Sequence, residues 1–132
     1  MSALRVLVVD DHLATVELTS FVLGAAGFVV ESTTDAVNAI FLISNFGPDL
    51  ILMDIQMPGV DGLELTRQLK AEPSMRHIVV VAFTAFAMKG DEARMRAAGC
   101  DAYIGKPFDV SSLAETVRSS IRARGGEETS VR

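Results

Sequence analysis

The sequence has a single cysteine, Cys100, so it holds neither an internal disulfide nor a cysteine-rich metal site. It lacks any apolar run approaching the ~20 residues that a membrane-spanning helix needs. The first residues also reach a double aspartate too early for a signal peptide. These absences predict a cytoplasmic protein without membrane insertion.

Positive charge is scarce as well, with 12 Lys and Arg against 17 Asp and Glu and a net charge of -5. A general nucleic-acid binder would show a basic patch, so the composition disfavours nucleic acid as a partner. A chain of 132 residues that is 49% hydrophobic and 22% charged fits one globular domain. We expect this domain over residues 1–124. A flexible tail is expected over residues 125–132, where two glycines interrupt a stretch without periodicity.

Five short apolar runs recur along the chain, and each is followed by a segment with helical periodicity. Three runs are almost continuously apolar in their middles, which is typical of strands covered on both faces. Strand and helix alternating five times predict an α/β fold with a parallel, doubly wound sheet. The runs are "RVLVVD" (5–10), "FVVES" (28–32), "DLILMD" (49–54), "HIVVVAFT" (77–84) and "DAYIGK" (101–106).

Acidic residues are placed where two of the predicted helices begin. Asp35 and Asp61 each precede a helical segment, and aspartate is a favoured N-cap because its carboxylate accepts backbone N–H groups. The methionines, Met53, Met75, Met88 and Met95, are interpreted as packing residues.

Polar side chains follow the predicted strands at the points where the strands end. In an open parallel sheet these ends meet at one edge, where ligands bind. Three adjacent carboxylates repel one another by about 4 kcal/mol per pair at ~4 Å and an effective dielectric of 20. A divalent cation would relieve that repulsion, and an all-oxygen ligand set favours Mg²⁺. The converging residues are Asp10, Asp11, Asp54, Thr84 and Lys106.

This combination of groups suits a phosphoryl group. A cation and a lysine neutralise its oxygens, and a hydroxyl donates a hydrogen bond to it. One carboxylate is then free to be the nucleophile, because aspartate can carry a phosphoryl group. We expect that role for Asp54, which ends the central apolar run alone.

These segments resemble the receiver domains of two-component response regulators, over residues 4 to about 122. The likeness rests on "VVDDH", "ILMDIQMPGVDG", "AFTA" and "DAYIGKP", in this order and at strand ends. The resemblance implies a (βα)5 flavodoxin-like fold with strand order 2-1-3-4-5. Around "TAFAMKGDEARMRAAGC" the chain is similar to stand-alone receivers of the DivK type and to receivers of hybrid histidine kinases.

The family likeness also implies a role for each site residue. Asp54 would accept a phosphoryl group from a phosphohistidine, and Mg²⁺ would be bound by Asp10, Asp11, Asp54 and the backbone carbonyl of Gln56. Thr84, Ala85 and Lys106 would surround the phosphoryl group, and Thr84 and Tyr103 would switch in response. His12, beside the acidic pair, is interpreted as a solvated loop residue and not as a ligand.

The implied function is that of a single-domain response regulator in a phosphorelay. Its partners would be a histidine kinase or histidine phosphotransfer protein and a downstream protein target, which could be a hybrid kinase. It would not be an enzyme with a separate substrate, because it would catalyse only its own phosphorylation and dephosphorylation. The alternative is a pseudo-receiver, a protein-interaction module that works without phosphate.

Two other classes fit the sequence less well. An aspartyl-phosphate hydrolase needs a second acid two residues after its nucleophile, whereas "VVDDHLAT" has adjacent acids. A flavin or nucleotide carrier needs a glycine-rich phosphate loop after the first strand, and none follows here.

The outer face of the first predicted helix is expected to dock the partner. The apolar periodicity of residues 13–26 assigns one face to the core, with Ala14, Leu18, Phe21, Val22 and Ala25. The predicted docking residues, on the opposite side, are Leu13, Val16 and Leu23.

Overall fold

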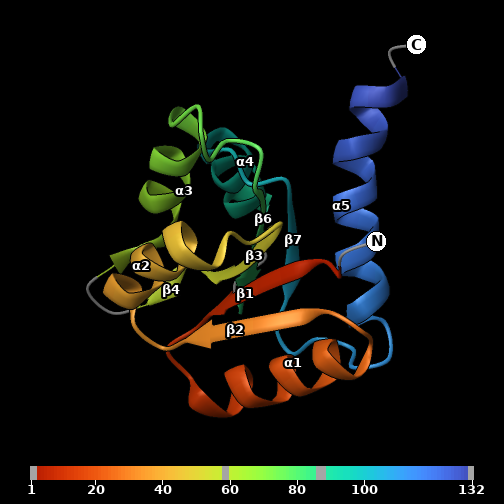
Figure 1. Cartoon of the computed structure of the whole chain (residues 1–132). Helices are drawn as coiled ribbons and strands as arrows, with labels where there is room; N and C mark the ends of the chain where they lie inside the picture. Colours follow the sequence, from red (N-terminus) through yellow and green to blue (C-terminus); the bar gives the residue numbers. More distant parts are fainter. Residues whose placement is uncertain (1–2, 58–59, 86–88, 131–132) are drawn as a thin grey trace.

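A computed structural model describes residues 3–57, 60–85 and 89–130. Its centre is a five-stranded parallel sheet in the order β2-β1-β3-β6-β7 (Figure 1). The strands are β1 (Arg5–Val9), β2 (Val29–Thr33), β3 (Leu50–Asp54), β6 (Val79–Thr84) and β7 (Ala102–Gly105). Counted along the chain without the short β4 and β5, this is the expected order 2-1-3-4-5.

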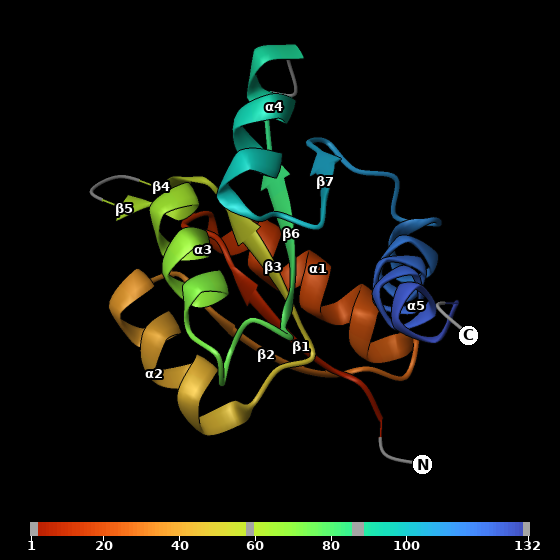
Figure 2. The same cartoon turned by 90° about the horizontal axis from the view of Figure 1, so that it is seen from above.

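Five α-helices cover the two faces of the sheet. On one side lie α1 (Leu13–Ala25) and α5 (Leu113–Ser130). On the other lie α2 (Ala36–Phe46), α3 (Gly62–Ala71) and α4 (Lys89–Ala98), as Figure 2 shows from above. The doubly wound α/β fold predicted from the sequence is therefore confirmed.

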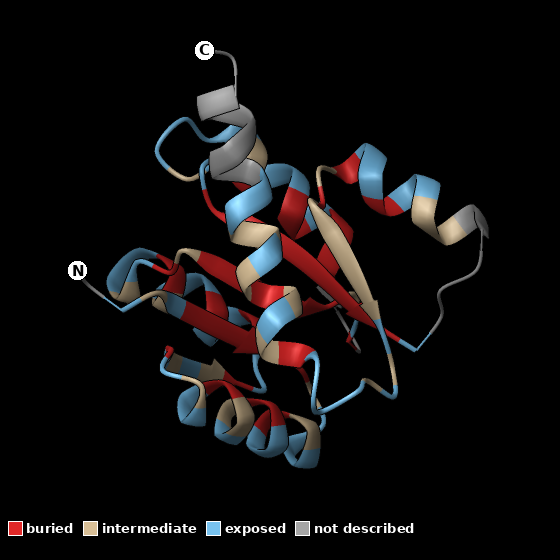
Figure 3. Cartoon of the chain, turned by 90° about the vertical axis from the view of Figure 1, so that its right-hand side faces the viewer, coloured by how far each residue is buried: buried red, intermediate tan, exposed pale blue. Residues whose placement is uncertain are grey.

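The burial of the inner strands on both faces explains why their sequences are continuously apolar. Every residue of β3 and β6 is buried, and so is β1 apart from its first residue (Figure 3). Side chains alternate between the faces, so Val6 and Val8 join the core under α1 and α5, whereas Leu7 and Val9 join the core under α2, α3 and α4.

The helix starts follow the capping chemistry expected from the sequence. The Asp35 carboxylate accepts the Val37 amide at 2.9 Å, and Asp61 accepts the amides of Leu63 and Glu64 at 2.9 and 3.3 Å. Before α3, a two-stranded antiparallel ladder that the sequence did not predict pairs β4 (Gln56–Met57) with β5 (Val60–Asp61). The packing interpretation is confirmed for Met53 and Met95, which are buried, and Met88 lies outside the described residues.

The face prediction for α1 is wrong. Val16 and Leu23 are 4% and 0% exposed and pack in the core, whereas Leu18 and Phe21 are 45% and 74% exposed. Only Leu13, at 61%, lies outside as predicted. The cause is that apolar residues surround this helix, so their periodicity does not single out one buried face.

The helix α5 continues to Ser130, past residue 124, where the domain was expected to end, and the flexible tail over residues 125–132 stays a prediction. The helix extends well beyond the sheet in Figure 1. Once the packed turns of α5 have formed, each further residue adds a hydrogen bond without a new nucleation cost. Two glycines within this stretch each disfavour the helix by about 1 kcal/mol.

An ion pair fixes the edge of the sheet where β6 and β7 begin. Lys70, at the end of α3, donates to Asp101 Oδ2 at 2.9 Å and to the carbonyl of Ile78 at 2.6 Å. The same Asp101 oxygen accepts the amide of Val80 at 2.9 Å. The two charged side chains are only 16% and 21% exposed, so this pair ties α3, β6 and β7 together at the edge opposite the predicted site.

Candidate functional site

Three charged groups predicted from the strand ends meet at the opposite edge. The Lys106 ammonium lies 2.6 Å from Asp10 Oδ2 and 3.4 Å from Asp54 Oδ2. Asp10 follows β1, Asp54 ends β3, and Lys106 follows β7. Because these strands run parallel, the fold brings together groups that are 44 and 52 residues apart in the sequence.

Burial makes this cluster electrostatically costly. Asp10 is 0% exposed and Asp54 is 3% exposed, so water screens their mutual repulsion weakly. Burial raises the pKa of Asp54 above its ordinary value, and the Asp10 charge raises it further. The amide of Gln56, which donates to Asp54 Oδ1 at 2.9 Å, and the Lys106 ammonium both act to lower that pKa.

A third acidic group, Asp11, completes a set of oxygens suited to a cation. Ligand atoms from Asp10, Asp11, His12 and Asp54 all lie within 4.8 Å of one another. Among the described residues, Asp11 Oδ1 is buried and accepts no hydrogen bond, although His12 Nδ1 approaches it to 3.2 Å. Buried carboxylate oxygens without a donor fit a hard divalent ion such as Mg²⁺.

His12 contacts the acids more closely than its interpretation as a solvated residue implies. Its backbone amide donates to Asp10 Oδ1 at 2.9 Å, and its ring Nδ1 lies 3.3 Å from the same oxygen. The ring itself is 70% exposed, as expected for a loop residue. Its position directly after two aspartates was the sequence signal for this contact.

The space above the carboxylates is a cavity of about 440 Å³ lined in part by Thr15, Ala85 and Lys106. Thr84 lies at its edge, where its hydroxyl donates to the Gln56 side chain at 3.5 Å. The ammonium of Lys106 is 5.1 Å from the centre of the Phe83 ring, so the two side chains form a cation–π interaction. Of the predicted phosphoryl-binding residues, Ala85 and Lys106 therefore line this cavity beside Asp54, and Thr84 is buried next to Ala85.

Tyr103, the predicted switch residue, lies outside this cavity. Its hydroxyl donates to Glu92 of α4 at 3.3 Å, and its ring packs against the core under α2, α3 and α4. In the sheet it pairs with Ala82, two positions before Thr84. The connection from the cavity to Tyr103 therefore runs through the pairing of β6 with β7.

A second cavity, of about 480 Å³, opens beside the first. It is lined by Ala14, Thr15 and Leu18 of α1 and by the segment Lys106–Phe108, together with Ala85. The exposed stripe of α1, defined here as Leu13, Ala14, Leu18 and Phe21, continues from this groove. An apolar surface thus borders the acidic cavity, at residues different from most of those predicted.

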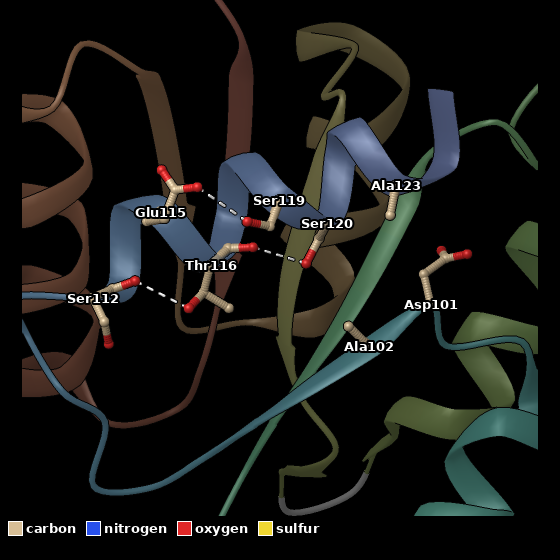
Figure 4. A pocket seen from close by; sticks show the side chains of 8 residues that line it. All are labelled: Asp101, Ala102, Ser112, Glu115, Thr116, Ser119, Ser120 and Ala123. Atoms are coloured by element: carbon tan, nitrogen blue, oxygen red, sulfur yellow. Dashed lines mark hydrogen bonds between the residues drawn. The ribbon is translucent and has the colours of Figure 1, made fainter. Parts of the chain in front are cut away.

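A third cavity, of about 430 Å³, lies between the start of β7 and α5 (Figure 4). Its polar groups are already engaged within the protein. Thr116 donates to the Ser112 carbonyl at 3.0 Å, Ser120 to the Thr116 carbonyl at 2.9 Å, and Ser119 to Glu115 at 3.2 Å. The reactive groups therefore belong to the acidic cavity and not to this one.

The model of the response regulator receiver domain matches residues 6–118 of the chain. The chain belongs to the response regulator receiver family. It is 46% identical to the polar-differentiation response regulator DivK of Brucella anthropi over 114 residues, which are 86% of this chain and 93% of the relative. The DivK of Brucella suis is equally similar, with the same identity and coverage.

Solved receiver structures agree with the fold. A CheY-like receiver from Methanospirillum hungatei is 31% identical, with a TM-score of 0.83 over 96% of this chain and 99% of that one. The receiver of a signal transduction histidine kinase from Syntrophus aciditrophicus is 31% identical, with a TM-score of 0.81 and 92% coverage of both chains. Receiver domains bind Mg²⁺ in an acidic pocket and interact with kinases or phosphotransfer proteins. Within the described residues, no helix is long and apolar enough to cross a membrane.

Proposed function

We propose that this protein is a single-domain response regulator whose Asp54 accepts a phosphoryl group from a phosphohistidine of a partner protein. The observation that carries the proposal is the contact of Lys106 with both Asp10 and Asp54 at the strand ends, where Lys106 and Asp54 line one cavity. Membership of the receiver family and the 46% identity to DivK support it.

The chemistry assigned to this chain is a transfer between two side chains. An Asp54 carboxylate oxygen attacks the phosphorus, an O–P bond forms, and the P–N bond to the donor imidazole breaks. The imidazole leaves with the electron pair of that bond and takes up a proton. Lys106, already 3.4 Å from Asp54, would then pair with a phosphoryl oxygen, and the Thr84 hydroxyl would leave Gln56 to donate to another.

A bound Mg²⁺ would be held by Asp10, Asp11, Asp54 and the backbone carbonyl of Gln56. When bound, it supplies positive charge that neutralises the carboxylates and the phosphoryl oxygens. The buried Asp11 oxygen without a donor supports this assignment. His12 would have to move aside from the acids, which its largely exposed ring permits.

The partner presenting the phosphohistidine would dock on the exposed stripe of α1. This stripe borders the cavity lined by Lys106 and Pro107, so a helix of the partner that packs on the stripe would reach the acidic site. Leu18 and Phe21 supply exposed apolar area there, as interaction surfaces commonly do.

The output would be a change in the population of two conformations, read by a downstream protein. The phosphoryl group favours one conformation only by binding it better than the other. The domain needs no separate small-molecule substrate, because it catalyses its own phosphorylation and dephosphorylation.

Intact mass after incubation with acetyl phosphate and Mg²⁺ tests the proposal. The wild type and an Asp35→Asn control should gain one phosphoryl group, since Asp35 only caps α2. Asp54→Asn and wild type in excess EDTA should gain none. Labelling of Asp54→Asn would move the acceptor elsewhere, and an unlabelled wild type would favour the pseudo-receiver.

A further inference from the structure

The tyrosine of β7 is tied to the neighbouring helix by its hydroxyl. Tyr103 donates a hydrogen bond of 3.3 Å to Glu92 Oε1, in the first turn of α4. Its ring is half-buried against the core, so the hydroxyl is directed outward, to the surface where β7 and α4 meet. The elements lie side by side in Figures 1 and 2.

The acceptor is held in place by a second contact. Glu92 Oε2 pairs with Arg96 Nε at 3.2 Å, one helical turn later, which leaves Oε1 directed at the tyrosine. Both side chains are well exposed, at 42% and 61%, so the ion pair itself contributes little stability. Its effect is to orient the carboxylate.

Asp101, directly before β7, and Tyr103, its second residue, secure the strand by contacts of unequal strength. Before its first residue, Asp101 is bound by Lys70 and by the Val80 amide, with both charged groups mostly buried. At Tyr103 the side-chain tie to α4 is one hydrogen bond to a solvent-facing carboxylate. A rearrangement of β7 and α4 would therefore break the Tyr103 contact before the Asp101 contact.

The pairing of β6 with β7 connects Tyr103 to the acidic cavity. Thr84 pairs with Gly105, and Ala82 pairs with Tyr103. A shift of Thr84 toward a phosphoryl group would thus act on the strand that carries Tyr103.

We propose that Glu92 is a positioning residue that holds Tyr103 and α4 in the resting arrangement, and that this latch sets the free-energy cost of switching. The inference rests on the proposed function at Asp54. In this proposal the active conformation lacks the latch, so removing it should strengthen binding of a phosphoryl mimic, although Glu92 does not line the acidic cavity.

The contact can be tested without any phosphoryl chemistry. The chain has one tyrosine and no tryptophan, so tyrosine fluorescence and ring NMR signals report Tyr103 alone. Glu92→Ala should change both signals, whereas Glu92→Gln, which keeps an acceptor oxygen, should restore most of the wild-type signal. Asp91→Ala is the matched control, because Asp91 is in the same helical turn but pairs with Arg94. Wild-type signals in Glu92→Ala would overturn the latch.

The coupling is tested by titrating beryllofluoride with Mg²⁺. Loss of one hydrogen bond from the resting state should make Glu92→Ala bind about two- to tenfold tighter than wild type. Asp91→Ala should stay within about twofold, as surface changes away from special contacts usually do. Changed tyrosine signals with unchanged affinity would overturn the role in switching. A wild type that does not bind the mimic would refute the proposed function, while the first measurement still decides whether the contact exists.

Discussion

At the scale of single residues, the acidic site holds buried carboxylates whose mutual repulsion lowers the stability of the folded protein. Asp10 and Asp54 are almost fully buried side by side, and Lys106 lies closer to Asp10 than to Asp54. Asp54 is therefore the less well compensated carboxylate. This imbalance has measurable consequences for stability.

Asp54→Asn should raise the melting temperature of the metal-free protein at neutral pH, because it removes a buried charge. A carboxyl group whose pKa is raised by folding contributes stability below its unfolded pKa and loses it as pH rises through the folded pKa. In EDTA, the wild type should thus lose more stability than Asp54→Asn as pH rises from the unfolded pKa of Asp54 to its folded pKa. Thermal melts across pH check this. Parallel curves for the two proteins would mean that the Asp54 charge costs nothing.

Lys106→Met should lower stability and make it more dependent on Mg²⁺. Methionine keeps an apolar stem over the Phe83 ring but leaves the two carboxylates without their countercharge. Removing one partner of a buried pair costs about 3 kcal/mol. Saturating Mg²⁺ should raise the melting temperature of Lys106→Met more than that of wild type, and equal increases would contradict the charge argument.

At the scale of elements, α1 shows where sequence patterns stop being informative. The strands were predictable because short apolar runs flanked by turn residues are typical of buried strands. The helix starts were predictable because Asp35 and Asp61 cap helices as expected. In α1 the apolar residues surround the helix, so only the packing of α5 and the sheet decides that Val16 faces inward. The Tyr103 contact with Glu92 was not predictable either, since it depends on side-chain directions across two elements.

Phe21→Ser should slow phosphotransfer from a protein donor while leaving phosphorylation by acetyl phosphate unchanged. Phe21 is exposed on the stripe beside the acidic cavity, so its loss should change stability by only ~0.5 kcal/mol. The matched control is Phe41→Ser on α2, which is similarly exposed but lies on the other side of the sheet. Equal slowing by both variants, or with both donors, would remove the case for docking on α1.

Val16→Ser should behave differently from the surface variants of the same helix. It leaves a cavity and a hydroxyl in the core, which costs roughly 2 kcal/mol or more. Denaturant unfolding measures the difference. A loss as small as that of Phe21→Ser would contradict the orientation of α1.

Gly62→Ala should destabilise the protein by about 1–3 kcal/mol, because the site is already closely packed. An added Cβ would lie 2.7 Å from the Cα of Ile55 and 3.2 Å from the carbonyl oxygen of Asp54. The loop after Asp54 would have to shift, so phosphorylation should slow as well. The Gly24→Ala control, on α1, meets no atom within 4 Å and should show neither effect.

At the scale of the whole molecule, the reactive groups and the Lys70–Asp101 ion pair occupy opposite edges of one parallel sheet. The acidic cavity lies where the strands end, and the Lys70–Asp101 pair lies where β6 and β7 begin. We therefore expect a signal from Asp54 to travel across β6 and β7 to α4 and not through the edge that holds Lys70 and Asp101.

Amide chemical shifts measured with and without a phosphoryl mimic should follow this route. Changes are expected from Thr84 through residues 89–96 of α4 and 102–118, which include β7 and the start of α5. The strand β2, at the other end of the strand order from β7, and its neighbour α2 serve as an internal reference and should change little. Changes confined to the acidic cavity would contradict the switch.

The separation of the two edges should also shape how the protein tolerates mutation. In a saturation library sorted once for folded protein and once for phosphate-dependent signalling, substitutions at Asp54 should pass the first sort and fail the second. Substitutions at Lys70 or Asp101 should be depleted in the first sort already, because they break the mostly buried pair. Evolution could then replace Asp54 at a gain in stability, whereas Lys70 and Asp101 could be replaced only if another contact took over from their ion pair.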